Sequence, residues 1–256
     1  MNKYNLIGEK LSHSFSPLIH KEILKYYHDD SSYGLIECSP DELFQYVKKG
    51  KEGLYKGFNV TIPYKIKIME YLDFIDDKAL KIGSVNTIKF EGGKAYGYNT
   101  DYYGFKQELE YYKINPKNKD CYILGTGGAS LAVSSVLSDL GGNVTFVSRN
   151  KENSNTITYD KLSEKNIDIL VNTTPVGMYP KIDSMPVEDN IINKAKCVID
   201  IIFNPLQTKL LEKANSSYNG LYMLVYQAIK AEEIWHDLEF KNTNDLYKMI
   251  EGELNE

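Results

Sequence analysis

A lysine in the stretch GFNVTIPYK is the first residue whose position suggests chemistry. Pro63 suits the first position of a helix, because its missing N–H would have no partner there. Lys65 then falls in the first turn of the predicted helix, where exposed N–H groups and the helix dipole are already positive. A carboxylate would stabilise that turn, so the cation is a local misfit of the kind expected at functional sites. The alternative is an ordinary surface lysine.

Other polar side chains near the N-terminus could bind a ligand. Ser14 and Ser16 precede a helix predicted to begin near Pro17, and two hydroxyls at that helix start could hold a carboxylate. For Ser16 alone, a plain N-cap is an equally good interpretation. Asn59 and Thr61 share one face of an extended segment, so both can reach a hydroxyl-bearing ligand.

An acidic partner for the lysine follows later in the chain. The sequences SVNT and YNTD supply Asn86 and Asp101. A lysine in positive surroundings loses its proton more easily, and Asp101 would orient Lys65. Such an acid/base pair suits the interconversion of an alcohol and a ketone.

A glycine-rich turn, LGTGGAS, follows a predicted strand and opens a predicted helix. Gly125 and Gly127 would allow the tight turn and a close approach to a pyrophosphate at the helix N-terminus. The pattern departs from G-x-G-x-x-G, because Gly128 follows directly and Ser130 takes the last position. The alternative is a glycine-rich turn of any α/β protein.

The only arginine among 30 basic residues ends the next predicted strand. An NAD site would carry Asp or Glu there, whereas this chain has Ser148 and Arg149. The planar fork of arginine suits a 2′-phosphate, so Arg149 predicts NADP. An exposed surface cation is the alternative.

Composition narrows the class of partner. The 256 residues carry a net charge of -5 without a long basic run, which disfavours nucleic acid and anionic membranes and favours a small-molecule substrate. The start lacks a signal peptide and no stretch is apolar enough to span a membrane, so we expect a cytoplasmic protein. The cysteines (Cys38, Cys121, Cys197) and histidines, including His13 and His20, show no disulfide or metal-ligand spacing, so we expect no metal.

Taken in order, these clusters resemble the shikimate dehydrogenase family over nearly the whole chain. The matching segments are GEKLSHSFSP, GFNVTIPYK, GSVNT, YNTDYYGF, GTGGAS, VSRN, VNTTPVGM and GLYMLVYQA. The resemblance implies NADPH-dependent, reversible reduction of 3-dehydroshikimate to shikimate in aromatic amino acid biosynthesis.

The resemblance also implies a role for individual residues. The catalytic pair would be Lys65 and Asp101. The substrate would be bound by Ser14, Ser16, Asn59, Thr61, Asn86, Gln227 and Phe203. The cofactor NADP would be held by Gly125, Gly127, Gly128, Ala129, Ser148 and Arg149, with Asp77 and Gly220 at further cofactor-contact positions.

The periodicity of the chain predicts an α/β fold with two lobes and a ligand cleft between them. Strands are expected at 3–8, 33–38 and 54–60, helices at 16–27, 40–50 and 63–72, a hairpin turning at Glu91–Gly93, and a helix capped by Asp101. The expected domains are 1–102 for substrate binding and catalysis, 103–222 as a Rossmann-like NADP domain, and 223–256 as C-terminal helices that return to the first lobe.

Two departures from the family pattern affect the expected site. Phe203 stands where the family usually has tyrosine, so a hydroxyl contact is missing. Only KENSN separates Arg149 from the next strand-like segment, so the helix usual in the family is absent. Rival interpretations are a dual quinate/shikimate dehydrogenase that accepts NAD, a non-catalytic NADP-binding sensor, and a plain α/β binding domain. The expected assembly is a monomer or a homodimer.

Overall fold

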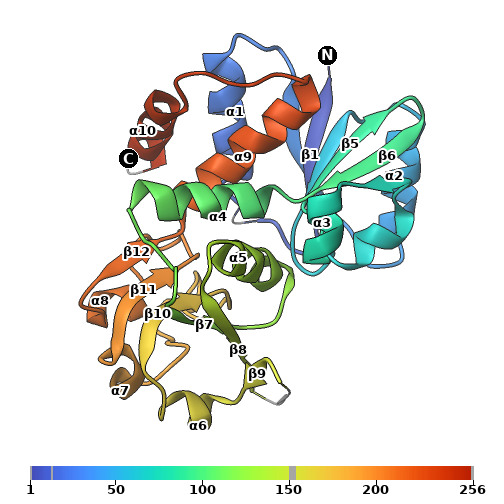
Figure 1. Cartoon of the computed structure of the whole chain (residues 1–256). Helices are drawn as coiled ribbons and strands as arrows, with labels where there is room; N and C mark the ends of the chain where they lie inside the picture. Colours follow the sequence, from blue (N-terminus) through green and yellow to red (C-terminus); the bar gives the residue numbers. More distant parts are fainter. Residues whose placement is uncertain (1, 13, 150–153, 255–256) are drawn as a thin grey trace. The chain divides into compact units, whose positions relative to one another are not determined.

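Strands and helices alternate along the chain and fold into two α/β units (Figure 1). The computed structural model describes residues 2–12, 14–149 and 154–254. Unit 1 comprises Met1–Gly104 and Val225–Glu256, and unit 2 comprises Phe105–Leu224. The predicted two-lobed α/β fold with a Rossmann-like second lobe is therefore confirmed.

Unit 1 is built on a mixed sheet with strand order β2-β1-β3-β5-β6-β4. Strand β1 pairs in parallel with β2 and β3, as the β-α-β-α-β order predicts, and β5 runs antiparallel to β3. Its strands are β1 (Lys3–Gly8), β2 (Ser32–Glu37), β3 (Gly57–Val60), β4 (Phe74–Ile75), β5 (Thr87–Glu91) and β6 (Lys94–Tyr98). Its helices are α1 (Ser16–Tyr26), α2 (Leu43–Lys51), η1 (Lys67–Tyr71), α3 (Asp77–Ile82), the start of α4 (Thr100–Tyr111), most of α9 (Leu221–His236), and α10 (Thr243–Leu254).

The two faces of this sheet have different neighbours. Phe58 and Val60 point into a hydrophobic core shared with α2, η1 and α3. The alternate residues Gly57 and Asn59 face the side covered by α9. A Cβ on Gly57 would lie 2.2 Å from Nε1 of Trp235, so only glycine lets α9 approach so closely. The side chain of Asn59 is thereby placed on the α9 face.

The hairpin between β5 and β6 turns where the sequence predicts. Glu91 pairs with Lys94, and the two residues between them, Gly92 and Gly93, have φ values of 56° and 74°. A two-residue turn with both φ values positive is the form that matches the twist of a hairpin. This prediction is confirmed.

The prediction that Asp101 caps its helix is wrong. Helix α4 already begins at Thr100, and Oδ1 of Asn99 accepts the N–H of Tyr102 at 3.1 Å. Asn99 therefore performs the capping. The carboxylate of Asp101 is left free for contacts with other parts of unit 1.

The predicted helix over 63–72 is also wrong in its first half. Pro63, Lys65 and Ile66 lie in turns, and only a 3-10 helix, η1, follows. The cause is tertiary: the Tyr64 hydroxyl donates to the carbonyl of Cys38 at 2.6 Å, and the carbonyl of Lys65 accepts the N–H of Val85. The helix-dipole explanation for the misfit of Lys65 does not hold, because Lys65 precedes the helix.

Unit 2 contains a parallel sheet in the order β12-β11-β10-β7-β8-β9. Counted from β7 outward in both directions, this is the doubly wound order of dinucleotide-binding folds. Its strands are β7 (Asp120–Leu124), β8 (Asn143–Val147), β9 (Thr156–Ile157), β10 (Ile167–Asn172), β11 (Ala195–Asp200) and β12 (Ser217–Asn219). Its own helices are α5 (Gly128–Asp139), α6 (Tyr159–Leu162), α7 (Asp189–Ile192) and α8 (Lys209–Lys213).

The connection from β8 to β9 is short. The N–H of Ser148 already bonds to the carbonyl of Ile157 in β9. The sequence predicts that no helix follows Arg149, and residues 148, 149, 154 and 155 are indeed not helical. Residues 150–153 of this segment lie outside the described residues. His13, considered above as a metal ligand, also lies outside them.

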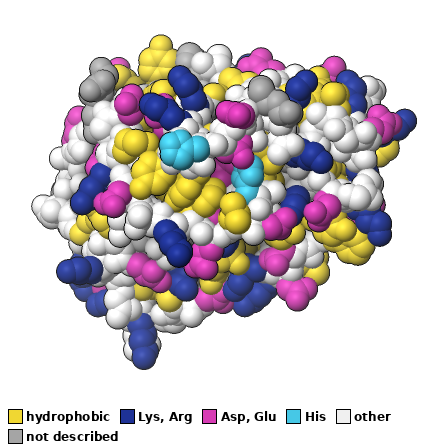
Figure 2. Space-filling view, turned by 90° about the horizontal axis from the view of Figure 1, so that it is seen from above, with side chains coloured by type: hydrophobic (Ala, Val, Ile, Leu, Met, Phe, Trp, Pro, Cys, Tyr) yellow, Lys and Arg dark blue, Asp and Glu magenta, His cyan; other side chains and the backbone are white. Residues whose placement is uncertain are grey.

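The surface charge and the helix lengths agree with what the sequence composition predicts. Figure 2 shows lysine, aspartate and glutamate side chains interspersed over one face, without a broad area of a single charge. Across the described ranges, none of the helices has the length and apolar character needed to cross a bilayer. Cys38 and Cys121 are buried and Cys197 is half-buried, all as free thiols.

One buried carboxyl group in unit 2, Glu108, forms no ion pair with any residue that the structure describes. Glu108 of α4 is 0% exposed, and its Oε2 accepts the N–H of Met223 at 2.9 Å. Its Oε1 has no hydrogen-bond partner within the part of the chain that the structure describes. Burial raises the pKa of Glu108 to about 8, although the bond from Met223 opposes the shift. The folded state therefore keeps this proton up to higher pH than the unfolded chain does.

This carboxyl group predicts a pH-dependent stability. Because the folded pKa lies above the unfolded one, Glu108 destabilises the fold as pH rises from about 4.5 to about 8. Glu108→Gln should make the protein more stable than the wild type at pH 9 by about 2 kcal/mol or more, with a much smaller difference at pH 5. Urea denaturation at both pH values measures this. The exposed Glu110→Gln is the control, and an equal effect of Glu108→Gln at both pH values would refute the prediction.

Candidate functional site

Lys65 and Asp101 meet in unit 1. Nζ of Lys65 lies 2.5 Å from Oδ2 of Asp101, and the two side chains are only 14% and 7% exposed. Asp101 lies in the first turn of α4, where the helix dipole favours a carboxylate. The positive end of a helix thus acts on the acid and not on the lysine. An ammonium group beside an oriented carboxylate can exchange a proton with a bound oxygen.

Asn86 holds the carboxylate of this pair. Its Nδ2 donates to Oδ1 of Asp101 at 2.9 Å and to Oγ1 of Thr100 at 3.0 Å. Its Oδ1 accepts the N–H of Thr100 at 2.6 Å and the hydroxyl of Thr87 at 3.1 Å. The amide is 2% exposed and uses its full donor capacity within the protein. It therefore fixes both the start of α4 and the position of Asp101.

The hydrogen bonds continue from Thr87 to the first helix. Asn59 donates from Nδ2 to Thr87 at 3.1 Å, and its Oδ1 accepts the hydroxyl of Tyr33 at 2.7 Å. The hydroxyl of Ser16 in turn bonds to that of Tyr33. Burial, and next the charge of Glu232, raises the pKa of Tyr33 well above its usual range, so its hydroxyl stays a donor. One network joins Ser16 to Lys65, and connected networks of this kind restrict the conformations of their members.

The two serines lie at the start of α1. Ser16 is the first residue of the helix, and Phe15 occupies the cap position, so the N-cap interpretation of Ser16 is wrong. The N–H of Ser16 is instead bonded to Oγ of Ser14 at 3.2 Å. Ser14 is half-buried and Ser16 is buried, both at the N-terminus of an 11-residue helix.

The other predicted substrate and cofactor residues of unit 1 are spread around this network. Thr61 is half-buried directly after β3, and Gln227 is half-buried on α9 with its Oε1 3.5 Å from Oγ1 of Thr100. Asp77 is exposed in the first turn of α3, next to the helix cap Asp76. Gln227 thus reaches the same network, and the cofactor contact of Asp77 stays a prediction.

The glycine-rich turn of unit 2 has the features that a dinucleotide requires. Gly125 has a φ of 107°, which favours glycine, and a Cβ there would meet Oγ1 of Thr173 at 3.0 Å. Among the residues that the structure describes, and apart from its own chain neighbours, none would lie within 4 Å of a Cβ on Gly127, so its backbone stays open to a close ligand. Helix α5 begins at Gly128 without a side-chain cap, and Ala129 follows in its half-buried first turn. These features fit a pyrophosphate at the helix N-terminus.

Arg149 lies at the same edge of the sheet as this turn. The N–H of Gly125 bonds to the carbonyl of Val147 at 3.0 Å, which ties the turn to the end of β8. Ser148 and Arg149 come directly after Val147, and Arg149 is exposed. Its charge acts on Tyr159, whose pKa burial raises and Arg149 lowers. An exposed guanidinium beside a phosphate-binding turn fits a 2′-phosphate.

The remaining candidates of unit 2 are Phe203 and Gly220. Phe203 is half-buried after β11. A Cβ on Gly220 would lie 2.3 Å from the carbonyl oxygen of Ile201, so packing alone requires glycine there. The predicted cofactor contact of Gly220 stays a prediction.

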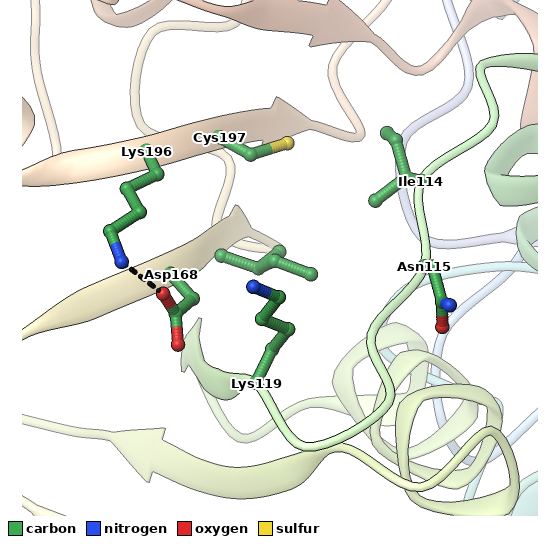
Figure 3. Close-up of a pocket in the computed structure, with 7 residues that line it drawn as sticks. Ile114, Asn115, Lys119, Asp168, Lys196 and Cys197 are labelled. Carbon is green, nitrogen blue, oxygen red and sulfur yellow. Dashed lines mark hydrogen bonds and ion pairs between the residues drawn. The ribbon is translucent and has the colours of Figure 1, made fainter.

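A separate cavity of about 170 Å³ lies at the opposite edge of the unit 2 sheet (Figure 3). It is lined by the starts of β7, β10 and β11, and the ion pair between Lys196 and Asp168, 2.7 Å long, lies at its side. Ligands of open α/β sheets bind at the carboxyl ends of the strands. This cavity is at the amino ends, so we do not assign it to the dinucleotide.

Sequence reasoning missed several members of the polar network. Tyr33, Thr87 and Thr100 were not singled out, because their partners are distant in the chain and no local motif marks them. Period-two alternation in β3 and β5 could have placed Thr87 beside Asn59. Within the described ranges, no group of three or more His, Cys, Asp or Glu side chains is arranged to hold a metal.

Comparisons with known proteins agree with these features. Residues 6–88 match the family model described as shikimate dehydrogenase substrate binding domain. The chain is 46% identical to a protein of Clostridium beijerinckii named shikimate dehydrogenase (NADP(+)), with 99% of each chain covered. It superposes with a TM-score of 0.93 on the crystal structure of shikimate dehydrogenase 1 from Peptoclostridium difficile, at 41% identity and 99% coverage of both. A shikimate 5-dehydrogenase of Thermus thermophilus in complex with NADP(H) and shikimate matches at 26% identity, with 98% of this chain and 100% of that one covered and a TM-score of 0.86.

Removal of the amide at the centre of the network should destabilise the fold. Asn86→Ala leaves the buried hydroxyls of Thr87 and Thr100 and the carboxylate of Asp101 with fewer partners, so we expect a loss of about 2–4 kcal/mol in the free energy of unfolding. Chemical denaturation measures the loss. The control is Asn143→Ala, which removes an exposed bond to Asp120 and should change stability by less than about 0.5 kcal/mol. Similar values for both variants would contradict the role of Asn86.

Proposed function

The chain belongs to the shikimate dehydrogenase family, and on this premise we propose that it catalyses the NADP-dependent, reversible reduction of 3-dehydroshikimate to shikimate. The observation that carries the proposal is the contact between Lys65 and Asp101 inside a nearly buried polar network. A reaction that adds hydrogen to a ketone needs a proton donor at the carbonyl oxygen, and this pair supplies one.

The cofactor of the reaction is NADP, which the residues of unit 2 fit. The turn at Gly125, Gly127 and Gly128 with Ala129 would bind the pyrophosphate, and Ser148 and Arg149 would bind the 2′-phosphate. When bound, the nicotinamide supplies or accepts the hydride. Arg149 favours NADP over NAD because no acidic residue ends β8 to bind a free ribose hydroxyl. Asp77 and Gly220 are proposed as further contacts to the cofactor.

Lys65 moves the proton in this mechanism. In the reductive direction its ammonium group donates a proton to the carbonyl oxygen at C3 while the hydride reaches the carbon. In the oxidative direction it accepts the hydroxyl proton. Oδ2 of Asp101 lies 2.5 Å from Nζ of Lys65, and Asn86 fixes the carboxylate. The proton donor is therefore preorganised for the reaction.

Residues near the network bind the substrate. Ser14 and Ser16 would hold its carboxylate beside the start of α1, with help from the helix dipole. Thr61 and Gln227 would bind ring hydroxyls. Asn59 and Asn86 were predicted to do the same, but their amides are engaged by neighbours, so we assign them first to holding the network.

One of the proposed substrate contacts departs from the family pattern. Phe203 is proposed to contact the substrate by ring packing alone, since it cannot donate the hydrogen bond that tyrosine would.

We place the activity in the cytoplasm with small molecules as its partners.

The catalytic pair predicts a large and selective loss of activity. Lys65→Ala should reduce kcat for shikimate oxidation by about 10²- to 10⁴-fold, because the proton acceptor is removed. Asp101→Asn keeps the shape but loses the charge, and a loss of at least about 10-fold is expected. Steady-state kinetics with NADP measures both. Lys67→Ala, which removes an exposed lysine two residues away, is the control with unchanged activity. Near-normal kcat in Lys65→Ala would exclude the proposed role.

The arginine predicts the choice of cofactor. Arg149→Ala should raise KM for NADP by about 10-fold or more, through loss of a charge-assisted bond to the 2′-phosphate, and leave kinetics with NAD nearly unchanged. Arg149→Lys keeps the charge but not the planar fork, so an intermediate KM is expected. Parallel titration of both cofactors measures the ratio. If KM for NADP and NAD rises equally in Arg149→Ala, the 2′-phosphate assignment is wrong.

A further inference from the structure

A buried cluster of ionisable side chains packs against the ring of Tyr33. Nδ1 of His20 in α1 is 2.5 Å from Oε1 of Glu232 in α9, and both side chains are 0% exposed. The other carboxylate oxygen of Glu232 is 3.1 Å from Nε2 of His236, one turn later in α9. The proposed reaction uses none of these three residues.

The carboxylate of Glu232 stays charged although it is buried. Burial raises the pKa of Glu232, but the bonds and charges of His20 and His236 outweigh it and hold this pKa below its usual range. The bond to Glu232 raises the pKa of His236 against the effect of burial, and the charges of Asp29 and Asp237 add to the rise. A buried carboxylate is costly unless it is paired and hydrogen-bonded. Glu232 meets both conditions, so its contact with His20 is firmly held.

The ring of His20 carries this constraint to Tyr33. The two rings are stacked with centroids 3.8 Å apart and an angle of 6° between their planes. Nε2 of His20 has no hydrogen-bond partner in the described parts of the chain, so the bond to Glu232 sets the orientation of the imidazole. Tyr33 belongs to β2, an edge strand of the unit 1 sheet. The ring centroid of Trp235 in α9 lies 6.2 Å from the ring centroid of Tyr33.

Tyr33 in turn touches two residues of the site. Its hydroxyl donates to Oδ1 of Asn59 at 2.7 Å and accepts from Ser16. A small rotation of the Tyr33 ring would therefore move the hydroxyl away from both partners. The position of the proposed carboxylate-binding serine depends on how firmly that ring is held.

We propose that Glu232 is a positioning residue for the substrate site: through His20 it fixes the ring of Tyr33, and thereby the side chains of Ser16 and Asn59. The inference rests on the proposed function. The proposal distinguishes an effect on substrate binding from an effect on the chemical step. Lys65 and Asp101 are connected to Tyr33 through several further hydrogen bonds of the network. Loss of Glu232 should therefore weaken substrate binding more than the chemical step.

The test is a comparison of KM and kcat in Glu232→Gln. We expect KM for shikimate to rise by about 5-fold, while kcat and KM for NADP change by less than about 2-fold. A merely structural role would lower the folded fraction and with it the apparent kcat, whereas KM does not depend on enzyme concentration. Glu233→Gln is the matched control, since it removes the neighbouring carboxylate, which bonds to Lys230 and Phe240 and not to His20.

A double-mutant cycle with Tyr33→Phe tests the route. Tyr33→Phe removes the hydroxyl and should raise KM for shikimate by itself. If Glu232 acts through Tyr33, the double variant should show a KM well below the product of the two single effects. Independent, multiplying effects would overturn the route, and an unchanged KM in Glu232→Gln would overturn the proposal.

A second variant covers the case in which Glu232→Gln does not fold. His20→Phe keeps a ring against Tyr33 but removes the bond to Glu232, and the same selective rise of KM is expected. An unchanged KM in folded His20→Phe would then overturn the proposal. Failure of the proposed function is distinguishable, because it would leave the wild type without shikimate oxidation, whereas failure of this inference alone leaves an active wild type.

Discussion

A carboxylate that is almost removed from water costs free energy unless positive charge and hydrogen-bond donors surround it. Lys65 provides the positive charge beside Asp101, and Asn86 provides a hydrogen-bond donor. These three residues come from the turn after β3, the segment before β5 and the first turn of α4. Stabilisation of one carboxylate therefore requires three distant segments to meet, and the same meeting creates a proton donor at a fixed position. Stability and the proposed catalysis depend on the same contacts.

Helix α9 completes unit 1 from the C-terminal end of the chain. Nε1 of Trp235 donates to the carbonyl of Ile88 at 2.9 Å, and the ring packs against Gly57, which has no side chain. This anchoring presents Gln227 to the polar network and Glu232 to His20. The face of the sheet covered by α9 thus carries the polar residues of the site, while the opposite face carries a hydrophobic core. Alternation along β3 separates the two functions.

Much of this could be predicted from the sequence, because period-two strands, glycine turns and capped helices are local patterns. The Gly92–Gly93 turn and the doubly wound unit 2 are examples. Prediction failed where tertiary bonds replaced local ones. The carbonyl of Lys65 bonds to Val85 and not to the following turn, so no helix forms there. Tyr33 was missed for the same reason: a tyrosine in an edge strand gives no local signal that its hydroxyl lies between two distant polar residues.

The most direct test of the account is the reduction of NADP by the purified wild-type chain with shikimate, followed through the absorbance of the reduced nicotinamide. Quinate and NAD are substituted in parallel. We expect rapid turnover with shikimate and NADP and much slower turnover after either substitution. Binding of NADP without any turnover of shikimate would contradict it, since an oriented lysine and carboxylate would then be present without the chemistry assigned to them.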